Sequence, residues 1–169
     1  MTCTIKPLLA FLFLLNQFNC FSQTALNSST SVINDTAFVN LKDFSKDFVY
    51  DMKYATDDNF LKSKVYDCAE CYLRYKTVKA LILANQRFME KGFKIKLFDC
   101  YRPLDIQKRM WAIVPDPQYV ANPKKGSIHN RGGAVDITLV DFDGKELDMG
   151  TKFDYFGIEA SHNYSNFSK

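Results

Sequence analysis

The sequence has little net charge, few histidines and no internal repeats. Its 22 basic and 19 acidic residues leave a formal net charge of +3, and the basic side chains are scattered among the acids rather than gathered in one stretch. This pattern argues against a nucleic-acid-binding surface. The chain has 169 residues, of which 47% are hydrophobic, so it is long and apolar enough to bury the core of one domain.

The sequence also lacks an apolar run that would cross a bilayer. A spanning helix needs about 20 apolar residues, whereas the run at residues 8–15 has eight. Near the start of the chain and after a basic residue, such a run is typical of a signal peptide. We therefore expect residues 1–22 to be a signal peptide, export to the periplasm, and no membrane span after cleavage. Lipid attachment at Cys20 is the weaker alternative, because residues 17–19 lack the small side chains that such sites carry.

Residues 23–36 are rich in Ser, Thr and Asn, which is typical of a flexible linker. The remaining residues, 37–169, are then expected to form a single folded domain. Nothing in the composition suggests a second one.

Only three of the five cysteines lie beyond the expected signal peptide: Cys68, Cys71 and Cys100. The first two form a C-x-x-C motif, but no second such motif or histidine pair accompanies it, so a structural zinc site is not expected. In an oxidising compartment, Cys100 is expected to form a disulfide with either Cys68 or Cys71. The residues alone leave both partners open.

The hydrophobic pattern changes its period along the chain. It predicts the following elements: strands near residues 48–54, 93–97 and 134–140, helices near 77–92 and 104–111, and a long loop at 114–131. A loop of that length inside a compact domain is often functional. The order predicts an α+β fold with a small antiparallel sheet that carries the site and is flanked by helices.

The strongest local signal is the segment at residues 127–136, which contains His129 and Asp136. Imidazole and carboxylate groups are both good Zn²⁺ ligands. A glycine pair between the two residues allows the backbone to turn tightly, and an apolar β-branched run around Asp136 predicts a strand. A loop that bears His129 would then fold back onto the strand that bears Asp136.

This segment matches the pattern S-x-H-x-x-G-x-A-x-D, and residues 99–103 match D-x-Y-R-P. Together they resemble the zinc D,D-peptidases of the D-alanyl-D-alanine dipeptidase and carboxypeptidase superfamily, which includes the vancomycin-resistance-type dipeptidases. The resemblance covers roughly residues 45–162, and it implies that Zn²⁺ is the cofactor.

The resemblance also implies roles for individual residues. His129 and Asp136 would be zinc ligands, and Arg102 would stabilise the tetrahedral intermediate. Ser127 would hydrogen-bond the substrate, and Asp154 would receive the ammonium group of a free dipeptide, with Asp148 as its rival.

The sequence departs from the family in one respect. Family members carry the general base and the third zinc ligand in a later E-x-x-H motif with tryptophan between the two residues. Glu159 and His162 have this spacing, but no aromatic residue separates them and they follow Asp136 closely. We therefore expect residues 37–169 to be a D,D-dipeptidase-like catalytic domain whose C-terminal part is missing and whose activity is low.

The expected function is zinc-dependent hydrolysis of D-alanyl-D-alanine, in cell-wall metabolism or in glycopeptide resistance. The expected partner is this small dipeptide, with no nucleic acid. One alternative is a D,D-carboxypeptidase that acts on peptidoglycan stem peptides. The other is a non-catalytic cell-wall binding module, because the E-x-x-H motif is absent.

Overall fold

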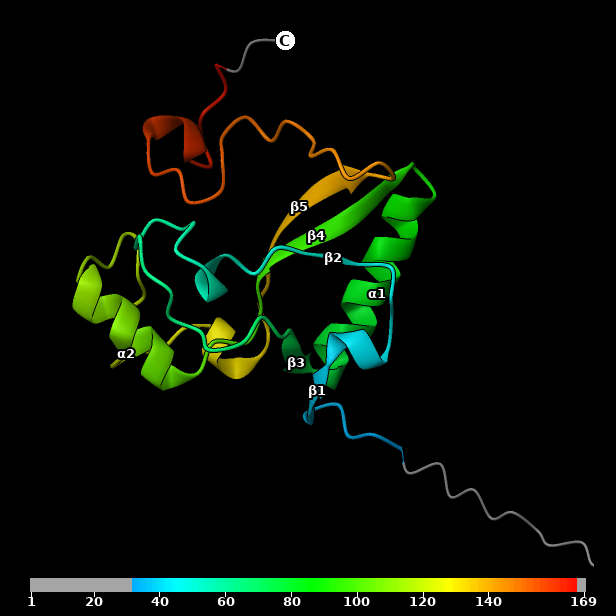
Figure 1. The fold of residues 1–169 in the computed structure, drawn as a ribbon, viewed down its shortest axis with the longest axis horizontal. Helices are drawn as coiled ribbons and strands as arrows, with labels where there is room; N and C mark the ends of the chain where they lie inside the picture. The colour runs from blue at the N-terminus through cyan, green and yellow to red at the C-terminus, as the bar shows by residue number, and fades with distance from the viewer. Residues whose placement is uncertain (1–31, 167–169) are drawn as a thin grey trace, which may run out of the picture. The chain divides into compact units, whose positions relative to one another are not determined.

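The computed structural model describes residues 32–166 (Figure 1). The chain divides into two units, Met1–Ser31 and Val32–Lys169, and the description below concerns the second. The predicted signal peptide at residues 1–22 and most of the predicted linker lie outside the described residues. Within 32–166, no helix combines the length and the apolarity that crossing a membrane requires.

The strands form two small sheets (Figure 1). In the first, β1 (Phe38–Asn40) pairs antiparallel with β3 (Tyr72–Arg74). The second has three strands in the order β2-β4-β5, with bounds Val49–Tyr50, Phe93–Asp99 and Asp136–Asp141.

The three-stranded sheet is mixed rather than antiparallel as the sequence predicts. Strands β4 and β5 are antiparallel, but β2 runs parallel to β4. A parallel pair needs a long crossover connection, and the segment between β2 and β4 supplies one that includes a helix. The predicted α+β class is confirmed. The predicted antiparallel direction of the strand near residues 48–54, which is β2 in the structure, was wrong.

Two α-helices flank the sheets, α1 (Tyr75–Met89) and α2 (Leu104–Ile113). Helix α1 packs against β4, β3 and β1 (Figure 1), and it buries Val78 and Leu81 on the face toward them. Gly92 follows the helix with a φ of +87°, a left-handed conformation that glycine adopts without strain.

The core consists of two hydrophobic clusters. The first gathers α1 and the sheets, and its buried members are Leu41, Phe48, Met52, Cys71, Leu73, Val78, Leu81, Ile95, Leu97 and Cys100. The second surrounds α2, and its buried members are Tyr54, Leu61, Val65, Met110 and Val120. The predicted strand at 48–54 is shared between them, because the chain leaves β2 and turns into a 3-10 helix at Lys53–Ala55 that buries Tyr54.

A disulfide joins Cys71 to Cys100. Of the two partners that the sequence left open for Cys100, the structure therefore selects Cys71, and Cys68 is an exposed free cysteine. Both bonded cysteines are fully buried in the first cluster.

The buried side chain of Asn85 fastens α1 to the sheet. Its Oδ1 accepts a hydrogen bond from the Ile95 amide at 2.8 Å, and its Nδ2 donates to the Asp47 carbonyl at 3.2 Å.

We predict that Asn85→Ala lowers the free energy of unfolding by about 1–3 kcal/mol, because it leaves the buried N–H of Ile95 without this partner. Urea denaturation measures this, with Gln86→Ala at the exposed neighbouring position as the control. Equal losses in the two variants would contradict the prediction.

Candidate metal centre

The candidate site lies where β4 ends and β5 begins. Asp99, the last residue of β4, pairs with Asp136, the first residue of β5. The two carboxylate residues therefore lie on adjacent strands at the same end of the sheet. His129 comes from the 3-10 helix His129–Arg131, at the end of the loop that precedes β5. Gly132 ends this turn in the left-handed region with a φ of +66°, and a Cβ there would clash with the Phe38 ring. The predicted tight turn is therefore confirmed.

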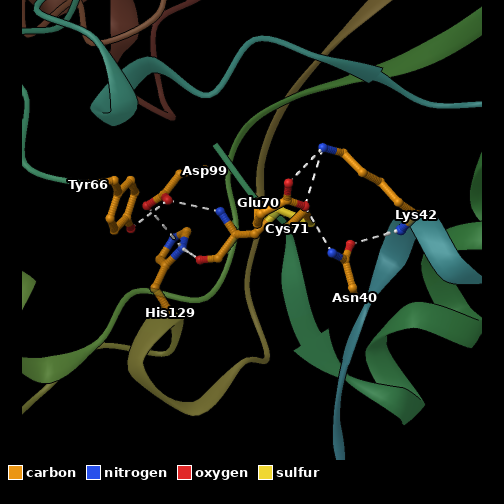
Figure 2. The surroundings of a disulfide bond; sticks show 8 residues. Asn40, Lys42, Tyr66, Glu70, Cys71, Asp99 and His129 are labelled. Atoms are coloured by element: carbon orange, nitrogen blue, oxygen red, sulfur yellow. Dashed lines mark hydrogen bonds and ion pairs between the residues drawn. A yellow bond between two sulfur atoms is a disulfide. The ribbon is translucent and has the colours of Figure 1, made fainter. Parts of the chain in front are cut away.

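The ring of His129 is oriented by a backbone carbonyl (Figure 2). Its Nδ1 lies 2.8 Å from the carbonyl oxygen of Cys100. A carbonyl can only accept, so Nδ1 carries a proton, and in the neutral ring the lone pair resides on Nε2. Nε2 lies 3.5 Å from Oδ1 of Asp136. The imidazole thus presents its ligating nitrogen to the second predicted ligand.

Neighbouring groups favour a positive charge on His129. Burial lowers the pKa of this side chain, but the Asp136 and Asp99 carboxylates and the Cys100 carbonyl outweigh burial, so the net shift of the His129 pKa is upward. A metal ion at Nε2 would take the place of the proton that these groups attract.

Asp99 and Arg102 form a buried ion pair beside His129. Oδ2 of Asp99 accepts from Nη2 of Arg102 at 2.6 Å and from Nε at 3.1 Å. Its Oδ1 accepts from the Tyr66 hydroxyl and from the Cys100 amide. Burial raises the pKa of Asp99, and the Arg102 guanidinium and His129 oppose that increase. With its acceptor positions occupied in this way, the carboxylate anchors the arginine.

Arg102 is held on a second side by Gln107. Nη1 of Arg102 donates to Oε1 of Gln107 at 3.1 Å, and the amide of that glutamine donates to the Ala121 carbonyl. The guanidinium has five N–H donors, and three of them have these partners. The Tyr66 hydroxyl is a further hydrogen-bond neighbour of the guanidinium, so among the described residues at least one N–H of Arg102 is left for a ligand.

The donors at the site fit a zinc ion. Ligand atoms of Asp99, His129 and Asp136 lie within 4.8 Å of one another. Two ligands at about 2.0–2.1 Å from a tetrahedral zinc stand about 3.3–3.4 Å apart, close to the 3.5 Å between His129 Nε2 and Asp136 Oδ1. Asp99 faces Nδ1 at 3.6 Å instead and is committed to Arg102. His129 and Asp136 are therefore the residues that could ligate the metal, whereas Asp99 holds Arg102 beside them.

Asp154 is connected to this centre through Tyr54. The Tyr54 hydroxyl donates to both carboxylate oxygens of Asp154, at 3.2 and 3.3 Å. The guanidinium of Arg102 lies 5.3 Å from the centre of the Tyr54 ring. Burial raises the pKa of Asp154 to about 6, and its φ of +57° is in the left-handed region.

Asp154 also lines a cleft of about 880 Å³. Its rival Asp148 lines the same cleft, but the Asp148 carboxylate accepts from the Gly150 amide and lies on an exposed turn. Of the two acids, Asp154 is the one that the structure links to Arg102.

Ser127 has a local role in the turn. Its Oγ accepts a hydrogen bond from the His129 amide at 3.2 Å. This bond helps to fix the start of the 3-10 helix that carries the imidazole. A contact of Ser127 with substrate stays a prediction.

Glu159 and His162 do not join the metal centre. His162 is exposed and Glu159 is half-buried, and Glu159 accepts a hydrogen bond from the Tyr155 hydroxyl at 2.8 Å. Within residues 32–166, the group of three potential metal ligands contains neither of them.

Three residues of the site were not among the predicted ones: Asp99, Tyr66 and Gln107. Asp99 has a local signal, because it precedes Arg102 by three residues in the D-x-Y-R-P segment and ends a strand. Tyr66 and Gln107 lie in other segments, and no sequence spacing connects them to the motif.

Comparisons with known proteins show the family of the chain. The family model for D-ala-D-ala dipeptidase (peptidase M15) matches residues 34–168. A D-alanyl-D-alanine dipeptidase of Escherichia coli K12 is 38% identical over 129 residues, which cover 76% of this chain and 66% of that protein.

Two enterococcal proteins with the same name are also similar. The one from Enterococcus faecium is 31% identical, with 69% of this chain and 68% of that protein covered. The one from Enterococcus faecalis is 29% identical, with 76% and 74% covered. The chain belongs to the D-ala-D-ala dipeptidase family, and it spans about two thirds of the length of these relatives.

The buried pair gives a stability prediction. We expect Asp99→Asn to lower the free energy of unfolding by about 3–5 kcal/mol, because it leaves the Arg102 charge buried without its counterion. Asp105→Asn is the matched control, since it removes the acid of an exposed pair with Lys108 at the same i,i+3 spacing. Exposed pairs contribute little. Similar unfolding midpoints in urea for the two variants would contradict the prediction.

Proposed function

We propose that the site hydrolyses the dipeptide D-alanyl-D-alanine with a Zn²⁺ ion held by His129 and Asp136. The observation that supports this most directly is the 3.5 Å separation of His129 Nε2 and Asp136 Oδ1, beside an arginine that Asp99 and Gln107 hold in place. Membership of the dipeptidase family supports the substrate.

Each residue has a defined task in the proposed reaction. When bound, zinc acts as a Lewis acid toward the scissile carbonyl and the attacking water. Arg102 is fixed by Asp99 and Gln107 before substrate arrives, so an N–H group left free can stabilise negative charge on the carbonyl oxygen without reorganisation. Ser127 lies next to His129 and hydrogen-bonds the bound peptide.

Asp154 sets the substrate length in this proposal. A carboxylate that pairs with the α-ammonium group favours a free dipeptide, because a longer or acylated chain has an amide at that position. This argument favours the dipeptidase over the D,D-carboxypeptidase acting on peptidoglycan stem peptides.

We also propose that the protein acts outside the cytoplasm, on cell-wall fragments or on the glycopeptide target. The disulfide between Cys71 and Cys100 supports this, because such bonds persist in oxidising compartments. The apolar run at residues 8–15 supports export.

The direct test measures zinc affinity and release of D-alanine for the whole chain. His129→Ala should weaken zinc binding by about 100-fold or more, because losing a ligand exceeds the 10–100-fold cost of losing a ligand's supporting partner, and hydrolysis should stop. His162→Ala is the control and should keep both properties.

Three results would change the proposal. Equal loss of zinc affinity in His129→Ala and His162→Ala would reject His129 as the specific zinc ligand. An absence of zinc binding by the unaltered chain would reject the metal centre. Dipeptide binding without release of D-alanine would favour a non-catalytic cell-wall binding module.

The pKa of Asp154 predicts a pH dependence. The ionised carboxylate binds the ammonium group, so kcat/KM for D-alanyl-D-alanine should fall up to tenfold per pH unit below about pH 6. Asp154→Asn should show a low kcat/KM without this acidic limb, and asparagine tolerates the left-handed backbone of this position.

The acylated dipeptide N-acetyl-D-alanyl-D-alanine serves as the comparison substrate. The unaltered chain should prefer the free dipeptide, and Asp154→Asn should reduce that preference. A preference that survives the substitution would reject Asp154 as the ammonium site and would make Asp148 the residue to test.

A further inference from the structure

We propose that the Cys71–Cys100 disulfide positions His129 for metal binding, so that the metal affinity of the site depends on the oxidation state of this cysteine pair. The inference rests on the proposed metal centre. It assigns both cysteines a role in positioning a ligand, in addition to the stabilisation that any disulfide gives.

Cys100 contacts the site through both of its backbone polar groups. Its amide donates to Oδ1 of Asp99 at 2.9 Å, and its carbonyl accepts from Nδ1 of His129 at 2.8 Å. One peptide segment thus holds the carboxylate that anchors Arg102 and also sets the tautomer of the imidazole.

This segment lies beyond the regular sheet. The pairing of β4 with β5 is irregular between Leu97 and Asp99, and its last pair joins Asp99 to Asp136. Cys100 follows that pair. Two links join it to β3 of the neighbouring sheet: the disulfide, and a hydrogen bond from the Tyr101 amide to the Tyr72 carbonyl at 3.0 Å.

The other end of the disulfide is firmly fixed. The Cys71 carbonyl accepts from the Leu41 amide at 2.9 Å. The side chain of Glu70, the preceding residue, accepts from Asn40 at 2.9 Å and from Lys42 at 3.3 Å (Figure 2). Through the disulfide, the frame formed by β1, β3 and the turn after β1 fixes the position of the Cys100 carbonyl.

Cleavage of the disulfide would release this constraint. A dithiol reductant transfers two electrons and two protons to the bond, Cys71 and Cys100 become thiols, and the reductant becomes a disulfide. The two sulfur atoms then repel each other at bonding distance and must separate. The hydrogen bond from the Tyr101 amide to the Tyr72 carbonyl is then the remaining link between this peptide and β3, so the Cys100 carbonyl is held less firmly as the acceptor of Nδ1 of His129.

The expected effect is a 10–100-fold weaker affinity for zinc, which is the usual consequence of losing the hydrogen-bond partner of a ligating histidine. Both sulfur atoms are buried, so a reductant reaches them only when the segment opens. The metal centre would therefore respond slowly to the redox state of its surroundings.

The test uses the full chain with Cys3, Cys20 and Cys68 replaced by serine, so that no other thiol binds metal or exchanges with the disulfide. In this background, Cys71→Ala with Cys100→Ala removes the bond without creating new zinc ligands. The dissociation constant for zinc is measured by competition with a chelator, and the absorption spectrum of the Co²⁺ form reports the ligand geometry.

Two further variants separate positioning from stability. Val78→Ala lies in the same core cluster and destabilises the fold while the disulfide stays intact, so its zinc affinity should stay within about twofold of the background. If the double alanine variant does not fold, Cys71→Val with Cys100→Ala restores part of the buried volume. All zinc affinities are measured at a temperature well below the thermal unfolding midpoint of each variant.

A second measurement needs no metal. Long-range ¹H–¹⁵N NMR of the metal-free protein should show the Nδ1–H tautomer of His129 in the background chain and a mixture of tautomers after removal of the disulfide.

Loss of zinc affinity in the cysteine variant but not in Val78→Ala supports the inference, and equal affinities overturn it. If the background chain itself binds no zinc, the proposed function fails. The tautomer then decides separately whether the disulfide positions His129, and an unchanged tautomer overturns the inference.

Discussion

The ion pair between Asp99 and Arg102 lies where the two hydrophobic clusters meet, and the candidate site is arranged around it. Asp99 is followed by Cys100, which belongs to the first cluster, and it accepts from Tyr66, which packs against the second. An unpaired charge in this place would cost several kcal/mol. Each partner is therefore surrounded by further hydrogen bonds, and those bonds leave little freedom for the guanidinium.

The cost of burying this pair has a functional consequence. A buried ion pair contributes little net stability compared with well-packed apolar residues, so stability alone does not account for it. What it does supply is an arginine whose direction is fixed in advance, next to a histidine whose ligating nitrogen is also fixed. Preorganised charge of this kind is the main source of transition-state stabilisation in many enzymes.

The sequence predicts those parts of the site that depend on neighbouring residues. His129 and Asp136 could be found because the loop, the turn at Gly132 and the start of β5 are all encoded within ten residues. The helices at 75–89 and 104–113 could be found because their apolar residues recur at helical spacing. Each of these features needs only local information.

The parts that the sequence does not predict depend on contacts between distant segments. Cys68 and Cys71 are equivalent as partners of Cys100 until β3 places one of them in the core. The direction of β2 depends on how the chain crosses over to β4, and its two residues carry no pattern of their own. Tyr66 reaches the site across 33 positions, through its hydrogen bond with Asp99.

The charges of the site are matched to two cationic ligands in the proposed function. Three carboxylates, those of Asp99, Asp136 and Asp154, face one guanidinium, and Arg102 compensates Asp99. The remaining two acids have different surroundings. Asp136 faces the lone pair of His129 at 3.5 Å, an environment suited to a divalent metal, whereas Asp154 receives a hydrogen bond from Tyr54 and lines an open cleft. Arg102, His129 and Asp136 do not line that cleft, so the connection between Asp154 and the metal centre is the Tyr54 side chain, whose hydroxyl donates to Asp154 and whose ring lies against the Arg102 guanidinium.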